Sequence, residues 1–365
     1  MERFMNKFLL ALLMMSIFSL SAVEACTGLQ VKTKDGIYIS GRTLEFGIFL
    51  PTSAVSVPRN YKFVGQTPLG GGKEWTTKYA SIGLIIADNK VILDGVNEKG
   101  LSVGMFYLPG YAEYSITTKK NQNISMSSSD FNQWILSQFK TVAEVKSAIK
   151  KNEAIISKVL TPGFPPKVQP FHFLVSDKSG KSIVIEPIEG KLVVYDNPVG
   201  VLTNSPTFDW HMTNLKNYVN LRAENAKDIE INGDIINSLG QGTGMLGLPG
   251  DFTPPSRFIK AVAFSATAIP EKNAQRGVYQ VFHLLNNFDI PVGLARTVHK
   301  GVIYSDYTMI TTVRDSKNLR FFWKTYEDQN IRMIDLKKVD KNAKKITIIS
   351  TSTKQTFIDM SKKLK

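Results

Sequence analysis

The sequence predicts a single α+β domain. Strand-like runs come first, amphipathic helical patterns follow, and strand-like runs return in the last third of the chain. This order is typical of an α+β fold, because a parallel α/β sheet would alternate strands and helices throughout. No internal repeat and no long Ser/Gly/Pro linker divides the 365 residues, so we expect residues 26–365 to form one domain.

The start of the chain is expected to be a secretory signal peptide, residues 1–25, rather than part of the fold. Arg3 and Lys7 precede an apolar run from Phe8 to Leu20, which is too short for a comfortable membrane span. The residues that end at Ala25 fit a signal-peptidase site. We therefore expect a periplasmic or secreted protein that is not inserted in a membrane after cleavage, with an uncleaved N-terminal anchor as the alternative.

The strand pattern begins directly after the predicted cut. Residues 26–33 and 37–44 flank a Lys34-Asp35-Gly36 turn, which predicts a β-hairpin with Cys26 at its first position. Further strands are predicted, in chain order, at 82–87, 91–96, 102–108, 171–176, 182–186, 191–195, 302–313, 319–326 and 346–349.

Helical periodicity occupies the middle of the chain. A long amphipathic pattern runs from a Ser129-Asp130 cap to about Lys151, with apolar residues on one face. Further helices are predicted at 208–222, 255–268 and 274–287.

Composition and charge exclude several classes of protein. The chain is 43% hydrophobic and 21% charged, which is ordinary for a folded globular protein. Its net charge of +14 favours anionic partners without identifying one, and the lysine-rich stretch 337–345 lacks the interleaved aromatic residues of a nucleic-acid site. With one cysteine and four scattered histidines, we expect no disulfide, no metal site and no nucleic-acid partner. The histidines are His172, His211, His283 and His299.

Cys26, the only cysteine, is the candidate nucleophile. Cleavage after Ala25 would leave it with both a thiol and a free α-amino group. A thiol with a pKa of about 8.5 can exchange a proton with an amine of pKa about 7.7–8.0 at neutral pH, so one residue can supply nucleophile and base. The alternative is a small buried hydrophobic residue.

Five motifs follow Cys26-Thr27-Gly28 in an order that resembles the choloylglycine hydrolase family, which includes bile salt hydrolases and penicillin V acylases. They occupy residues 41–45 (Gly-Arg-Thr-Leu-Glu), 96–101, 107–112, 202–210 and 248–258. The resemblance implies an N-terminal-nucleophile (Ntn) hydrolase with a four-layer αββα sandwich of two stacked antiparallel sheets. It also implies hydrolysis of a small-molecule N-acyl amide without metal or cofactor, and a homo-oligomer, commonly a tetramer.

The resemblance carries site residues over one by one. Cys26 matches the nucleophile, and Arg42 matches an arginine beside the thiol, where a permanent cation favours thiolate. Glu45 stands where many members have an aspartate that orients the α-amino group.

Three further residues complete the implied site. Asn204 matches the side-chain donor of the oxyanion hole, and the backbone N–H of Tyr107 would be the other donor. Arg257 matches a second active-site arginine.

The resemblance leaves the acyl group open among conjugated bile salts, penicillin V and acyl homoserine lactones. Tyr107 and the Tyr-Leu-Pro-Gly-Tyr loop favour penicillin V or an acyl lactone. One alternative is a binding lipoprotein with a lipid-modified Cys26, against which Glu24 and the absence of leucine at position −3 argue. The other is a catalytically inactive family member, for which Glu45 is the only hint.

Overall fold

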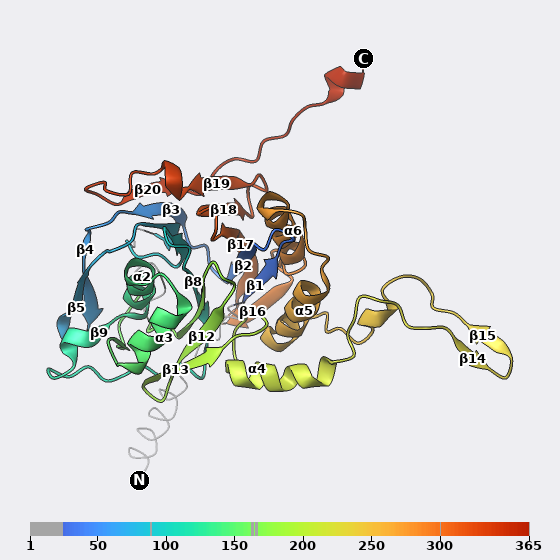
Figure 1. The fold of residues 1–365 in the computed structure, drawn as a ribbon, viewed down its shortest axis with the longest axis horizontal. Helices are drawn as coiled ribbons and strands as arrows, with labels where there is room; N and C mark the ends of the chain where they lie inside the picture. The colour runs from blue at the N-terminus through green and yellow to red at the C-terminus, as the bar shows by residue number, and fades with distance from the viewer. Residues whose placement is uncertain (1–24, 88–89, 162–163, 165–166, 300, 365) are drawn as a thin grey trace, which may run out of the picture.

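Figure 1 shows the computed structural model, which describes residues 25–364 except 88–89, 162–163, 165–166 and 300. The predicted signal peptide lies outside the described residues, apart from Ala25. Two large antiparallel sheets form the body. The first has the order β1-β2-β17-β18-β19, with β16 beside β17. Its strands are β1 (Cys26–Lys32), β2 (Tyr38–Phe46), β16 (Ala295–His299), β17 (Val302–Asp315), β18 (Arg320–Thr325) and β19 (Arg332–Asp335).

The second sheet is eight-stranded, with the order β13-β12-β11-β8-β7-β6-β3-β20. Its strands are β3 (Thr52–Val57), β6 (Ser81–Ile86), β7 (Asp94–Asn97), β8 (Ser102–Tyr107), β11 (Phe171–Ser176), β12 (Ser182–Ile188), β13 (Lys191–Asp196) and β20 (Thr347–Ser350). Polar and aromatic groups connect the two sheets. Arg314 of β17 forms a buried ion pair with Asp94 of β7, and the Arg42 guanidinium of β2 lies 4.4 Å from the ring centre of Phe106 of β8.

Helices cover the outer faces of both sheets. α5 (Pro254–Thr267) contacts β1, and α6 (Ala274–Asn286) contacts β1, β2 and β17. On the other side, α2 (Ser128–Gln138) contacts β7 and β8, and α3 (Val142–Lys150) follows it. Figure 1 shows the two helix pairs on opposite sides of the strands. The layers therefore run helix, sheet, sheet, helix.

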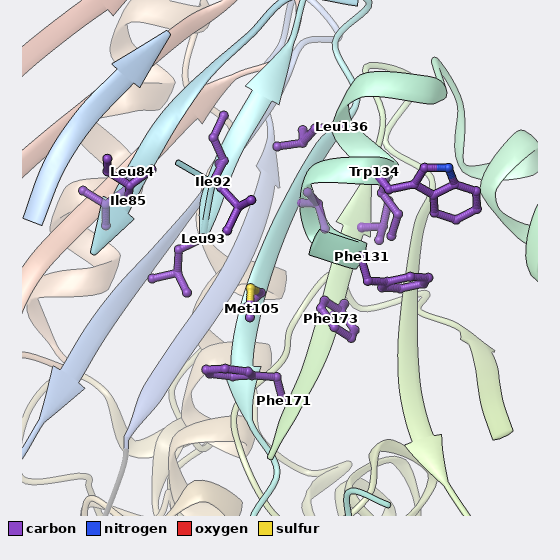
Figure 2. Packing of buried hydrophobic residues seen from close by; sticks show 14 of the residues in the cluster. Leu84, Ile85, Ile92, Leu93, Met105, Phe131, Trp134, Leu136, Phe171 and Phe173 are labelled. Atoms are coloured by element: carbon purple, nitrogen blue, oxygen red, sulfur yellow. The ribbon is translucent and has the colours of Figure 1, made fainter. Parts of the chain in front are cut away.

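The core between the second sheet and α2 is aromatic and aliphatic. Figure 2 shows Phe131 of α2 beside Phe173 of the sheet, and the side chains of Phe131, Trp134, Phe173 and Met105 are all buried. The ring centres of Phe131 and Phe173 are 5.0 Å apart. This packing explains why the apolar face of the predicted helix is buried.

The predicted helix from residue 129 to about 151 is wrong in one respect, because the structure has two helices there. A capping box between Ser127 and Asp130 starts α2, whose end is marked by the extended backbone of Phe139. Thr141 then caps α3 by accepting a hydrogen bond from the Glu144 N–H. Two strong N-caps thus divide one apolar periodicity into two helices.

Other predicted elements are confirmed with shifted bounds. The helix predicted at 208–222 is shorter, α4 (Phe208–Leu215), and the strand predicted at 91–96 starts later, at Asp94. The predicted hairpin is confirmed, since β1 pairs with β2 and Cys26 is its first residue.

Smaller elements complete the described chain. They are β4 (Lys62–Thr67) with β5 (Gly70–Thr76), β9 (Ser125–Met126) with β10 (Ile155–Ile156), β14 (Ile229–Ile231) with β15 (Asp234–Ile236), and the 3₁₀ turns η1 (Gln122–Ile124), η2 (Lys216–Tyr218), η3 (Thr243–Met245), η4 (Leu336–Lys338) and η5 (Ser361–Leu364). Residues 219–250, here named the arm, project from the body with β14 and β15 at their far end (Figure 1). Among the described residues, we find no helix with the length and hydrophobicity needed to span a membrane.

Candidate active site

Cys26 lies buried at the start of β1, and its thiol and backbone contact different partners. The Arg42 Nη2 donates to Sγ at 2.7 Å, and the Cys26 N–H donates to Asn204 Oδ1 at 2.7 Å. Burial raises the pKa of the Cys26 thiol, and the positive charges of Arg42 and Arg257 oppose this effect without cancelling it. The thiol in this form of the chain therefore needs a base before it can attack as thiolate.

Arg42 is held rigidly beside the thiol. Its Nη1 donates to the Met105 carbonyl at 2.6 Å, and its Nε donates to the Thr43 carbonyl at 3.2 Å. The guanidinium lies over the Phe106 ring, which adds a cation–π contact in a water-excluded site. A permanent cation is thus fixed at the sulfur atom.

Asn204 comes from the segment after β13, which joins β1 through a bridge between Leu202 and Gly28. Its Oδ1 accepts from Arg257 Nη2 at 2.8 Å as well as from the Cys26 N–H, and its Nδ2 donates to the Tyr107 carbonyl at 2.9 Å. The two N–H donors on one side of the amide and the carbonyl acceptor on the other determine which amide atom of Asn204 is oxygen and which is nitrogen. The amide NH₂ has a second hydrogen besides the one that Tyr107 accepts.

Arg257 reaches the same point from the first turns of α5. Its Nη1 donates to the Cys26 carbonyl and, at 2.9 Å, to Thr27 Oγ1, while its Nε donates to the Phe252 carbonyl at 2.8 Å. The side chain is buried, and four of its five N–H groups donate to protein acceptors. Arg257 therefore joins α5, β1 and the Asn204 segment.

Glu45 lies on β2, buried and close to this group. Its Oε1 accepts from Thr308 Oγ1 at 2.9 Å, while its Oε2 has no partner within the described part of the chain. Burial raises the pKa of Glu45 to about 7, against the lowering effect of Arg257. The Glu45 N–H donates to the Ala25 carbonyl at 3.0 Å, which places this residue at the predicted cleavage site.

The structure brings all six predicted site residues into one neighbourhood. Tyr107 enters through its backbone carbonyl, whereas its side chain packs against Phe46 and Phe171 and donates from its hydroxyl to Gln169 Oε1 at 2.6 Å. The Tyr107 ring is thus part of a buried aromatic group. No cluster of three or more His, Cys, Asp or Glu side chains that could hold a metal is found in the part of the chain that the structure describes.

Several residues close to this group were not predicted as site residues from the sequence. Thr308 lies directly opposite Glu45 on β17, and burial raises the pKa of its neighbour Asp306 to about 7, against the charge of Arg257. His172 and His211 contact the backbone of Thr203 and Asn204. Thr308, Asp306 and His172 are distant in sequence from the motifs, and the strand pairing of β17 with β2 and the packing of β11 bring them close. His211 directly follows the 202–210 motif, and the first turn of α4 brings its ring back to the Asn204 carbonyl.

Known proteins are similar to this chain in sequence and in fold. A family model described as linear amide C–N hydrolases, choloylglycine hydrolase family, matches residues 26–349. The bile salt hydrolase/transferase of Clostridium perfringens (strain 13 / Type A) is 38% identical over 326 residues, covering 88% of this chain and 95% of the relative. The penicillin V acylase of Pectobacterium atrosepticum is 27% identical over 322 residues, covering 83% and 78%.

Solved structures agree with the sequence matches. A crystal structure of a conjugated bile acid hydrolase variant from Clostridium perfringens has a TM-score of 0.81 at 35% identity, covering 92% of this chain and 99% of that one. Penicillin V acylase from Agrobacterium tumefaciens has a TM-score of 0.70 at 24% identity, covering 89% and 91%, and shares the fold. The expected Ntn-hydrolase sandwich is confirmed.

Proposed function

Because the chain belongs to the choloylglycine hydrolase family of linear amide C–N hydrolases, we propose that Cys26 becomes its N-terminal residue and hydrolyses an N-acyl amide through an acyl-enzyme. The observation that carries this proposal is the contact of one buried residue, Cys26, with Arg42 at its sulfur and Asn204 at its nitrogen. The family match also starts at residue 26, where the predicted cut would leave the new N-terminus. Export to the periplasm or beyond is part of this proposal.

Cleavage changes the chemistry of the Cys26 nitrogen. Removing Ala25 converts an amide that cannot accept a proton into an amine that can. The Glu45 Oε2, which has no hydrogen-bond partner among the described residues, can accept a hydrogen bond from the α-ammonium group of Cys26. In the first step the amine takes the thiol proton, and Arg42 stabilises the thiolate that attacks the substrate carbonyl.

The tetrahedral intermediate carries a negative oxygen that needs donors. The second Nδ2 hydrogen of Asn204 and the Tyr107 N–H are the proposed donors, and loss of one such donor typically costs about 10²–10³ in rate. The α-ammonium group then protonates the leaving amine as the C–N bond breaks. Water attacks the thioester, which releases the acid and restores the Cys26 thiol.

The proposed substrate has a bulky apolar acyl group on a linear amide. Tyr107 and its loop favour penicillin V or an acyl homoserine lactone. A conjugated bile salt is the second candidate, and the 38% identity to a bile salt hydrolase/transferase favours it. We therefore propose all three as a defined test set.

The first experiment expresses the whole chain with its own residues 1–25 in a Gram-negative host and measures the mass of the purified N-terminus. A free Cys26 in the periplasmic fraction is the expected result. A lipid-modified Cys26 would support the lipoprotein alternative, and full activity from chain that retains residues 1–25 would overturn the maturation proposal.

The second experiment measures kcat/KM of the mature protein on penicillin V, a glycine-conjugated bile salt and an acyl homoserine lactone, by detecting the released amine. The matched control is Cys26→Ala, which should release no amine from any of them. A folded mature protein that hydrolyses none of the three would support the inactive-member alternative.

We propose that the arm supports a homo-oligomer, expected to be a tetramer. Its hairpin exposes apolar side chains to solvent on a short two-stranded ribbon, which is at best marginally stable alone. Those side chains are Ile229, Ile231, Ile235 and Ile236. Sedimentation velocity should give about four times the chain mass, and Ile231→Ser with Ile235→Ser should reduce it. Ile116→Ser, exposed on the body, is the control, and a monomeric wild type would overturn the proposal.

A further inference from the structure

Two buried histidines from different layers contact consecutive carbonyl groups next to the site. His172 of β11 has its Nε2 at 3.1 Å from the Thr203 carbonyl oxygen, and His211 of α4 has its Nε2 at 2.8 Å from the Asn204 carbonyl oxygen. Both rings have no solvent exposure. Because a carbonyl oxygen only accepts, both Nε2 atoms carry the hydrogen.

Each ring is itself held in place. His172 Nδ1 lies 3.0 Å from Glu186 Oε1, which also accepts from the Phe208 N–H at 3.1 Å. Phe208 is the first residue of α4, so Glu186 links His172 to the helix that carries His211. This couples the two histidines through one buried carboxyl group.

The His211 ring is held by α5. It stacks on Phe258, the neighbour of Arg257, with ring centres 4.7 Å apart and planes 15° apart. Burial lowers the pKa of His211 to about 4, so the ring is neutral at ordinary pH and its single hydrogen sits on Nε2. The Nε2–H donor to the Asn204 carbonyl is therefore present at ordinary pH.

The segment that these histidines contact is also held by side-chain hydrogen bonds, which include the three of the Asn204 amide and one from Ser205 Oγ to the Pro109 carbonyl at 2.6 Å. Among the described residues, the backbone of this segment is hydrogen-bonded to β1 only at the bridge between Leu202 and Gly28. The Thr203 Oγ1 also donates to the Pro254 carbonyl at 3.0 Å. The Thr203 and Asn204 carbonyls are buried and need donors, because an unpaired buried carbonyl is costly. His172 and His211 supply the N–H donors for these two carbonyls, and the second carbonyl belongs to Asn204, whose side chain contacts Cys26.

We propose that His172 and His211 are positioning residues for the reaction, holding the Thr203–Asn204 backbone so that the Asn204 amide keeps its place beside Cys26. This inference rests on the proposed function, in which Asn204 stabilises the oxyanion. The Nε2 atoms of the histidines contact the backbone carbonyls of Thr203 and Asn204 rather than the thiol, so these residues act through Asn204. A displacement of about 1 Å at such a donor can reduce the rate about 10²-fold.

The test uses paired variants of the mature protein at His211. His211→Phe keeps a flat ring on Phe258 but loses the N–H donor, whereas His211→Gln keeps a donor but loses the ring. We expect His211→Phe to lower kcat at least about tenfold with KM within about twofold, and His211→Gln to keep most of kcat. His283→Phe, an exposed histidine of α6, is the matched control and should behave as wild type. Equal losses in the two His211 variants would indicate a packing role and overturn the inference.

A double-mutant cycle separates this inference from the proposed function. In an Asn204→Ala background, adding His211→Phe should lower kcat no further, because the histidine acts through the missing amide. If the fold-loss of kcat in the double variant equals the product of the losses in the two single variants, the inference is overturned. If Asn204→Ala itself keeps wild-type kcat, the oxyanion role in the proposed function fails. If Asn204→Ala is impaired while His211→Phe keeps wild-type kcat, only the inference fails.

Discussion

The Arg42 Nη2 lies 2.7 Å from the Cys26 Sγ, although the strand register pairs Arg42 with Gly28 and Cys26 with Leu44. The contact is diagonal across the β1–β2 hairpin, within reach of a long side chain. Gly28 opposite Arg42 leaves the space in which Phe106 lies under the guanidinium. One hairpin thus brings the candidate nucleophile and its cation together.

Replacing Cys26 with serine should abolish most of the hydrolysis. Cys26→Ser keeps a nucleophilic atom, but the hydroxyl has a far higher pKa than a thiol. We expect kcat/KM to fall more than about tenfold, a loss above about 1.4 kcal/mol, with little change in the thermal midpoint because the volumes are close. A serine variant that keeps more than about a tenth of the wild-type kcat/KM would show that Cys26 is not the nucleophile.

Replacing Glu45 with glutamine should shift the pH profile. The Glu45 carboxylate would stabilise the α-ammonium form of Cys26 and so raise the pKa of the amine; Glu45→Gln removes that charge and lowers the amine pKa. Since the neutral amine is the base, the acidic limb of kcat/KM should move to lower pH by about one unit or more. The measurement is a pH–rate profile on one amide substrate.

Arg42→Lys is the comparison for that profile. It keeps the positive charge but loses the planar fork that contacts Met105, Thr43 and the thiol, so the rate should fall at all pH values without a comparable shift of the limb. An unmoved limb and a normal rate in Glu45→Gln would mean that Glu45 has no part in holding the amine.

Adding a methyl group at Gly28 should disturb both stability and rate. A Cβ there would lie 2.7 Å from Phe106 Cζ and 3.2 Å from Leu174 Cδ2, so the ring under Arg42 must move. We expect Gly28→Ala to cost about 1–3 kcal/mol in urea unfolding and to lower kcat/KM. Gly250→Ala, where a Cβ meets open space, is the control. Wild-type behaviour of Gly28→Ala would show that the Phe106–Arg42 packing tolerates displacement.

The ion pair between the sheets should be important for stability. Asp94 accepts from Arg314, and from Thr312 Oγ1 at 2.5 Å, with both charged side chains buried. Asp94→Ala leaves the Arg314 charge without its partner, so the free energy of unfolding should fall by about 3–5 kcal/mol. Asp196→Ala, which removes an exposed partner of Lys146, is the control and should change little. Equal effects of the two substitutions in urea unfolding would contradict this prediction.

Patterns within short stretches of sequence correctly predicted several strands and helices. The hairpin from Cys26, the strands of residues 171–196 and the helices near 255–287 are confirmed, because alternation, turns and amphipathic periods are all visible in short windows. β4 and β5 gave no such signal, since the Gly70-Gly71-Gly72 start of β5 has the composition of a loop. The break between α2 and α3 was missed because the apolar period continues through it.

The prediction that Cys26 is the nucleophile comes from the sequence alone: it is a single cysteine at a predicted cut, followed by motifs that resemble one family of amide hydrolases, and that resemblance implies Arg42 beside the thiol. Tertiary structure decided which distant residues meet there. Asn204 and Arg257 reach Cys26 from the segment after β13 and from α5, and Thr308 reaches Glu45 because β17 pairs with β2. Of the two histidines that contact the Asn204 segment, His172 comes from the distant β11, whereas His211 follows Asn204 by seven residues on α4 and is the local exception. The other contacts arise from strand pairing and helix packing between residues far apart in the chain, and such pairings leave no period or spacing in a local stretch of sequence.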